Sequence, residues 1–221
     1  MGRPEKALLQ GSSSPCLVDF ARGLRAQRTT AGLTYTEMAG STSVSAATLK
    51  RAASGTSVPH IETVRQFYAA CRPYLPREQQ IPIWKTTLKA WQIARMEERG
   101  TLGARGVRLT LIADARDLSL ALQEFWEKKG ALSVRAIRRY SGTEILLPLT
   151  SLERILKREA LPQSKAQLLA IVRGCFATLM EEKQWDAAWQ KVFGPRRPPK
   201  GPDVSETRTA RPGPALFVSR H

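Results

Sequence analysis

Short blocks of helical periodicity, each closed by a turn signal, constrain this chain more than any other feature. Within residues 16–98, apolar side chains recur three and four positions apart in five such blocks, the spacing that gives a helix one buried face. Thr34 and Ser45 stand where helices begin, because their hydroxyls can cap free backbone N–H groups. Gly32 and Gly55 stand where helices end. The pattern predicts an all-α fold built from small helices.

One stretch of this region carries a recognisable motif. Residues 32–59 read Gly-Leu-Thr-Tyr-Thr-Glu-Met-Ala, then four residues, then Val-Ser-Ala-Ala-Thr-Leu-Lys-Arg, with a glycine and a proline following at positions 55 and 59. The motif resembles the Cro/C1-type (XRE) helix-turn-helix family, in a style similar to that of actinobacterial regulators. This resemblance implies a lambda-repressor-like domain that reads the major groove of double-stranded DNA with the helix from Ser45 to Ala53.

The resemblance and the helix geometry together predict which side chains contact DNA. Small alanines at the start of the helix from Ser45 allow close approach to bases, whereas Lys50 and Arg51 can donate to guanine. Contacts to phosphate are expected from the preceding helix start and from the first helix. The predicted residues are Arg28, Thr34, Tyr35, Thr36, Ser45, Ala46, Ala47, Thr48, Lys50 and Arg51. For Arg51, an ion pair with Glu37 or Glu62 is the alternative.

A divergent copy of the same motif follows in the second half of the chain. Residues 132–134 parallel residues 33–35 at an offset of 99, and residues 147–154 parallel residues 44–51 at an offset of 103. The offset change of four predicts an insertion in the inter-helix turn, around Thr143 to Leu146. The chain therefore resembles two tandem five-helix helix-turn-helix domains.

The second copy departs from the family pattern at two residues. Arg138 replaces the small alanine that lets two helices pack closely, and Glu153 stands where the first copy has Lys50. A carboxylate is repelled by phosphate, although it can accept a hydrogen bond from cytosine. Two roles stay open for this copy: dimerisation or partner binding, and direct DNA contact. The residues for direct contact are Ser133, Arg135, Leu149, Thr150, Arg154 and Lys157.

Composition divides the chain into five segments. Residues 1–15 and 195–221 lack periodic apolar positions, so we expect a flexible N-terminus and a disordered basic tail. The two domains are expected at residues 16–99 and 117–194. Between them, residues 100–116 begin with a glycine-rich run that is typical of a flexible linker.

The charge balance indicates a polyanionic partner. The chain has 35 Lys and Arg against 19 Asp and Glu, a formal net charge of +16, which favours nucleic acid or an anionic membrane surface. Residues 16–100 carry 12 basic and 6 acidic side chains, whereas residues 117–194 carry 12 and 9. No apolar run approaches the ~20 residues of a membrane-spanning helix. We expect a cytoplasmic, nucleoid-associated protein that does not bind membranes.

Residues that perform most enzyme chemistry are scarce. The three cysteines, Cys16, Cys71 and Cys175, are far apart in the sequence, a pattern typical of buried thiols rather than of a zinc site. The histidines are His60 and His221. Two histidines are too few for a multi-histidine metal site, and they argue against a histidine-based catalytic triad. We expect no catalytic residue, no metal and no cofactor.

These observations predict a sequence-specific double-stranded DNA-binding protein, a transcriptional regulator and not an enzyme. The alternative is a DNA-tethered interaction or assembly factor of a plasmid, phage or chromosome complex. In that case the second domain would bind a protein partner or a second copy of the chain.

Overall fold

The computed structural model describes residues 14–103 and 108–194, so most of the expected flexible N-terminus and the basic tail lie outside the described residues. The described residues form helices and no strand, and none of these helices is long and apolar enough to cross a membrane. The elements are α1 (Pro15–Thr30), α2 (Tyr35–Gly40), α3 (Ala46–Ala52), α4 (Ile61–Cys71), η1 (Arg72–Tyr74), α5 (Arg77–Glu98), η2 (Leu109–Leu111), α6 (Ala115–Lys128), α7 (Val134–Tyr140), η3 (Glu144–Leu146), α8 (Leu149–Leu156), α9 (Lys165–Gly174) and α10 (Leu179–Phe193). The all-α prediction is therefore confirmed for these residues.

Side-chain caps begin α2 and α3 at the positions where the sequence places them. Thr34 Oγ1 accepts a hydrogen bond from Glu37 N at 3.3 Å, and Glu37 Oε2 accepts one from Thr34 N at 2.7 Å. These bonds form a capping box, and they hold the pKa of Glu37 below its ordinary value. Ser45 Oγ accepts from Thr48 N at 3.3 Å and caps α3. Local hydrogen bonds therefore set the first residue of each of these two helices, independently of tertiary packing.

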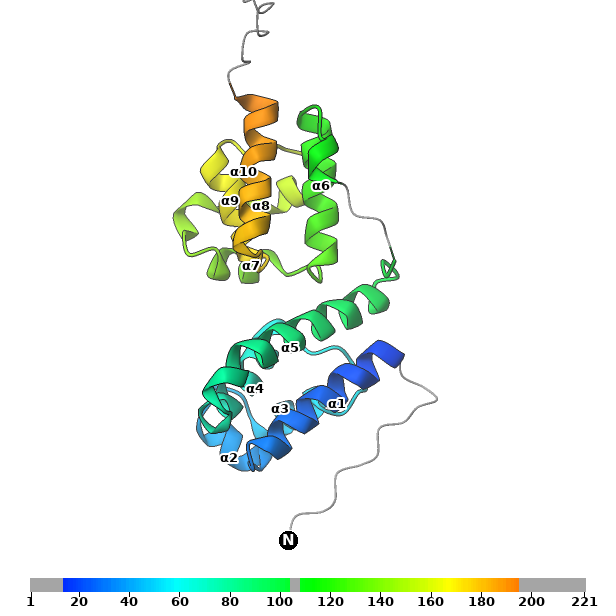
Figure 1. Ribbon diagram of the computed structural model, residues 1–221, viewed down its shortest axis with the longest axis vertical. Coiled ribbons are helices and arrows are strands. Elements are labelled where there is room, and N and C mark those ends of the chain that lie inside the picture. Colours follow the sequence, from blue (N-terminus) through cyan, green and yellow to red (C-terminus); the bar gives the residue numbers. More distant parts are fainter. Residues whose placement is uncertain (1–13, 104–107, 195–221) are drawn as a thin grey trace, which may run out of the picture.

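Helices α1–α5, here called the first helical group (Figure 1), bury apolar side chains in a core that is continuous with that of α6–α10. Every helix contributes an apolar side chain from its buried face, which explains the predicted helical periodicity. The deepest of these side chains are Leu24, Met38, Leu49, Phe67 and Trp91. The indole of Trp91 also donates to the carbonyl oxygen of Pro59 at 2.9 Å, so its one polar atom is satisfied.

Helices α6–α10, here called the second helical group, share three packed helix pairs with the first. In each group the first helix contacts the fifth, and the second helix contacts the third and the fourth. The core side chains include Leu122, Ile137, Leu152, Ile171 and Trp185. Gly174 lets α9 approach α7, because a Cβ there would lie 2.3 Å from the carbonyl oxygen of Ile137. The predicted insertion around Thr143 to Leu146 contains the short helix η3.

Part of the expected linker is packed structure. Within residues 100–116, η2 packs against α10, and Ile112 is fully buried. Lys191 of α10 donates to the carbonyl oxygen of Thr110 at 3.1 Å. Helix α6 then begins at Ala115, two residues before the expected start of the second domain. Glycine content alone did not reveal this, because the apolar run at Leu109 to Ile112 is too short to show a period.

The two groups contact each other along α5 and α6 (Figure 1). Arg99 donates two hydrogen bonds to the carboxylate of Glu127, at 2.8 and 2.7 Å. Gly130 has a φ of 92° and faces the ring of Trp91, where a Cβ would lie 2.7 Å from the nearest ring carbon. Glycine at this position therefore allows both the backbone conformation and the close approach of the groups.

A second contact joins α4 to α7 and to the residue after the C-cap of α9. The hydroxyl of Tyr140 donates to Glu62, and the guanidinium of Arg65 lies 4.4 Å from the centre of the Tyr140 ring. Phe176 stacks on Tyr140 with ring centres 4.9 Å apart, and its ring centre lies 6.4 Å from that of Trp84. An acidic, a basic and three aromatic side chains thus connect the groups at a point that no sequence motif marks.

Candidate nucleic-acid interface

The turn between α2 and α3 is anchored to the core of the first helical group. Thr42 Oγ1 donates to the carbonyl oxygen of Met38 at 3.1 Å, and Ser41 Oγ donates to the same oxygen at 3.0 Å. The backbone N–H of Val44 bonds back to Thr42 Oγ1 at 3.5 Å. Because the Met38 side chain is fully buried, this turn fixes the direction in which α3 leaves α2.

Helix α3 has one buried and one exposed face. Leu49 and Ala52 are buried, whereas Ala47, Lys50 and Arg51 are exposed. We call these last three residues the exposed face of α3. The helix contains no acidic residue, and its two cations lie in its last turn, where they are favoured by the helix dipole. Small and basic side chains therefore project together from a rigid support.

The alternative ion pairs considered for Arg51 are not formed within the described residues. Glu37 is held by Thr34 in the capping box, and Glu62 accepts from Tyr140 at the contact between the groups. No other carboxylate in the described part of the chain pairs with Arg51. Its guanidinium is exposed and keeps its donors for an external partner.

Two arginines of α1 connect the helices of the motif. Arg25 Nε donates to the carbonyl oxygen of Ala53 at 2.8 Å and so holds the end of α3. Arg28 Nη1 donates to the carbonyl oxygen of Leu33 at 2.9 Å, and its guanidinium lies 4.9 Å from the Tyr35 ring centre. Arg28 is predicted from the sequence to contact phosphate, and that contact stays a prediction. Arg25 and Arg28 are three positions apart, so they lie on one face of α1. This spacing is the sequence feature that could have indicated their shared contact with the helices of the motif.

The remaining predicted residues of the first copy lie at two helix starts. Thr34, Thr36 and Ser45 are exposed, while Tyr35 is half-buried against Phe67. Half-buried positions in α3 are Ala46 and Thr48. Because α2 and α3 pack against each other, the structure brings all of these positions onto one helix pair.

The predicted residues of the second copy occupy a more neutral surface. Ser133 caps α7, and Arg135 is exposed on the same helix. On α8, Leu149 is half-buried and Thr150 is exposed.

Two cations of the α8 region, Arg154 and Lys157, are each paired with a carboxylate. Lys157 Nζ lies 2.9 Å from Glu153, and Arg154 lies 3.9 Å from Glu159. The hydrogen bond to Glu153 raises the pKa of Lys157. This is the main difference between α8 and the exposed face of α3.

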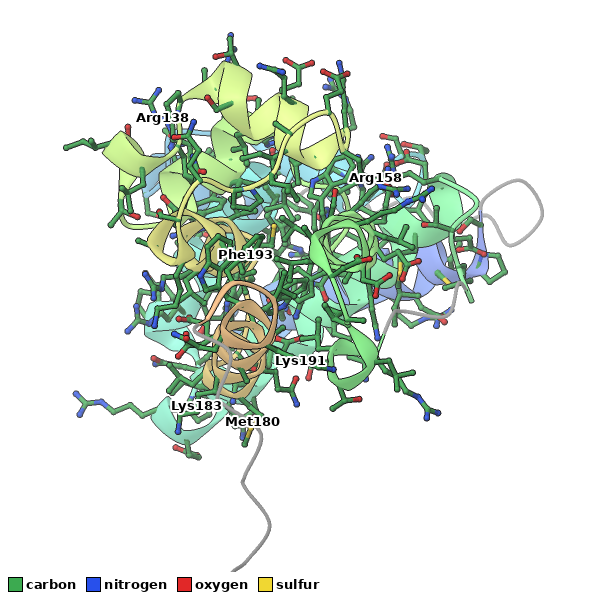
Figure 2. All side chains as sticks on the ribbon, turned by 90° about the horizontal axis from the view of Figure 1, so that it is seen from above. Arg138, Arg158, Met180, Lys183, Lys191 and Phe193 are labelled. Atoms are coloured by element: carbon green, nitrogen blue, oxygen red, sulfur yellow. The ribbon has the colours of Figure 1, made fainter. Side chains whose placement is uncertain are left out.

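Basic charge is also dispersed over the second helical group. Figure 2 shows Arg138 and Arg158 on separate sides of it, with the end of α10 at Phe193 between them. Arg138, one of the departures noted in the sequence, lies 3.5 Å from Glu144 in the inserted turn. Arg138 therefore lies apart from the cations at the end of α8, which are Arg154, Lys157 and Arg158.

The cysteines are free thiols with no partner that would activate them. Burial raises the pKa of Cys71 to about 11 and that of Cys175 to about 12, while Cys16 is only half-buried. The described residues contain no cluster of three side chains suited to a metal ion.

Comparison with known proteins agrees with the location of this site. Residues 19–72, which run from α1 to the residue after α4, match the family model of a helix-turn-helix domain. No curated protein and no solved structure matches the chain. The match covers the helix pair α2 and α3 and leaves the second helical group outside. Residues 19–72 therefore match a helix-turn-helix domain, which suggests DNA as a partner.

Proposed function

We propose that the protein is a sequence-specific double-stranded DNA-binding regulator that places α3 in the major groove. The observation that carries this proposal is the exposed face of α3, with Lys50 and Arg51 unpaired within the described residues and no acid on the helix. An arginine can donate two hydrogen bonds to guanine, and Ala47 leaves room for the backbone to approach the bases. The helix-turn-helix match at residues 19–72 supports the same partner.

We also propose that the second helical group is a divergent copy of the first, with the domain boundaries expected from the sequence. Left-handed backbone positions support this. Gly32 and Ala131 have φ of 67° and 46° and differ by the offset of 99, while Gly55 and Arg158 have φ of 74° and 65° and differ by the offset of 103. A non-glycine residue adopts this conformation only where its surroundings impose it. The coincidence therefore supports one backbone path used twice.

In this proposal the two copies have unequal roles. The first copy reads bases, whereas the paired cations of α8 leave the second copy to add weaker backbone contacts. A DNA-tethered interaction factor is the second candidate function. Ile145 in the inserted turn favours it, because this apolar side chain is 93% exposed and is accessible to a protein partner.

Selection of bound DNA from a random pool, with the full chain, tests the main proposal. We expect one enriched motif, and we expect Arg51→Ala to weaken binding to it by about 10- to 100-fold, the range for a lost bidentate base contact. Discrimination at one base pair should be lost at the same time. Arg154→Ala is the matched control, since it removes an exposed but paired arginine from α8, and it should weaken binding less than threefold.

Two results would contradict the proposal. The absence of any enriched sequence would exclude specific recognition. If Arg51→Ala weakened binding to all sequences equally, Arg51 would be a phosphate contact, and base reading by the exposed face of α3 would be wrong.

A further inference from the structure

A cavity of about 560 Å³ lies beside α4 and α5, where the first helical group meets the second. We call it the inter-group cavity. Its size is within the range of small-molecule sites, which are common between domains. The lining residues that matter here are Arg65, Tyr68, Arg72, Trp84, Lys85 and Phe176. Five of them come from α4, its C-cap and α5, whereas Phe176 belongs to the second group.

One wall of the inter-group cavity is aromatic. The ring centres of Tyr68 and Trp84 are 5.2 Å apart, and the Trp84 and Phe176 rings meet edge to face at 6.4 Å. All three side chains are half-buried, so each keeps part of its ring accessible. The Tyr68 hydroxyl donates to the carbonyl oxygen of Gln80 at 2.6 Å, which fixes that ring in place. This wall offers a preformed stacking surface for a planar ligand.

The rim of the inter-group cavity is cationic. Lys85 is exposed and forms no ion pair within the described residues, and Arg72 bonds only to the neutral amide of Gln80, at 3.2 Å. Arg65 lies over the Tyr140 ring. Among the lining residues there are three cations and one carboxylate, which belongs to Glu62.

That single carboxylate is already engaged. Glu62 accepts hydrogen bonds from Tyr140 and from Gln66, the latter at 3.2 Å, and it lies 3.4 Å from Arg139. Partial burial alone would raise the pKa of Glu62, but these hydrogen bonds and the nearby arginines outweigh it, and the pKa lies below its ordinary value. The cations at Arg72 and Lys85 are therefore left without a protein anion.

We propose that the inter-group cavity binds a small aromatic anion, with its ring against Trp84 and Phe176 and its acidic group at Arg72 and Lys85. An aromatic wall beside uncompensated cations recognises this class of ligand by stacking and by charge-assisted hydrogen bonds. Because Phe176 also stacks on Tyr140 at the contact between the groups, the bound ligand contacts both groups. It would favour their docked arrangement and, by linkage, affect any property that depends on docking.

The first test is a titration of the full chain with 8-anilinonaphthalene-1-sulfonate, an aromatic anion whose fluorescence reports binding, in the absence of DNA. We expect one saturable site. Lys85→Ala should weaken it about tenfold, as expected for a lost charge-assisted hydrogen bond. Lys89→Ala is the matched control, because Lys89 is an exposed lysine one turn further along α5 that does not line the cavity, and this variant should bind as the wild type does.

A second variant separates stacking from charge. Trp84→Leu should abolish saturable binding while its far-ultraviolet circular dichroism still shows a helical fold. If that variant unfolds, the comparison of Lys85→Ala with Lys89→Ala decides alone. Equal weakening in both lysine variants, or no saturable site, would overturn the proposal, because general attraction to a basic protein would then explain any binding.

Competition experiments identify the source of the ligand. Displacement of the probe by 1-naphthoate supports an aromatic carboxylate, and displacement by adenosine monophosphate supports a nucleotide. Equal displacement by inorganic phosphate, without any ring, would contradict the stacking wall and overturn the assignment. Since these measurements contain no DNA, their result is independent of whether the main proposal on DNA recognition holds.

Discussion

Arg158 holds a backbone conformation that is normally left to glycine. Its φ is 65°, in the residue that follows the C-cap of α8, and Gly55 has a φ of 74° at the matching place after α3. A side chain in this region clashes with its own backbone, which costs roughly 1–2 kcal/mol. The chain therefore carries strain at one of two equivalent helix ends and avoids it at the other.

Substitutions at these two positions should change the free energy of unfolding in opposite directions. We expect Arg158→Gly to raise the free energy of unfolding by about 0.5–1 kcal/mol, because relief of strain exceeds the added chain entropy, and Gly55→Ala to lower it by about 1–2 kcal/mol. Urea unfolding followed by circular dichroism measures both changes. Arg154→Gly is the control within α8, where glycine should cost about 1 kcal/mol. Equal destabilisation by both arginine-to-glycine changes would show that Arg158 is not strained.

At the scale of helices, the features that were predicted correctly from the sequence are those set by interactions between neighbouring residues. The start of α3 follows from the cap at Ser45, and its end follows from the glycine at position 55, because both signals act within one turn. The connections made by Arg25 and Arg28 were not predicted, since the same arginines suit phosphate contact equally well on sequence grounds. The packed segment before α6 was missed because η2 packs against α10, whose Lys191 bonds to Thr110 across 81 positions of the sequence.

The Ser45 cap should be a measurable part of the stability of α3. Removal of its oxygen in Ser45→Ala leaves the N–H of Thr48 without its partner, which is expected to cost about 1 kcal/mol. The change should appear as faster hydrogen exchange in the amides of α3 and in weaker DNA binding. Ser57→Ala provides a control, because Ser57 is exposed and caps no helix. If α3 exchanged at the same rate in both variants, packing rather than capping would hold this helix.

At the scale of the whole molecule, the contact between the groups could not be predicted from sequence. Tyr140 and Glu62 are separated by 78 positions, and neither belongs to an apolar period or a motif. The glycine-rich joint suggested independent domains, whereas the structure docks the groups through Gly130 and Trp91 as well. Patterns within a helix report which face is buried, but they do not report which distant surface buries it.

The pKa shifts at this contact define the pH range over which docking should persist. Burial and the hydrogen bond to Glu62 raise the pKa of Tyr140 from 10.0 to about 12, so its contribution is complete below pH 10 and is lost as pH rises through about 12. The pKa of Glu62 is lowered from 4.5, so its contribution is complete above that value and is lost as pH falls through the lower pKa. We expect a constant radius of gyration from about pH 5 to pH 10 in small-angle X-ray scattering.

Removal of two of the polar connections between the groups should favour their separation without unfolding either of them. In a double variant, Arg99→Ala deletes the bidentate bond to Glu127, and Tyr140→Phe deletes the bond to Glu62 while it keeps the ring. Each loss should cost about 1 kcal/mol of docking, less than a buried charged hydrogen bond would, because these side chains are partly exposed. The radius of gyration at pH 7 should increase, with unchanged helical circular dichroism. The double control Arg77→Ala with Tyr74→Phe alters exposed residues of the same types and should leave the radius unchanged. Equal radii in the two double variants would mean that the remaining contacts, the packing of Gly130 on Trp91 and the bonds of Arg95 to Gly130 and of Arg139 to Glu62, are sufficient to hold the groups together.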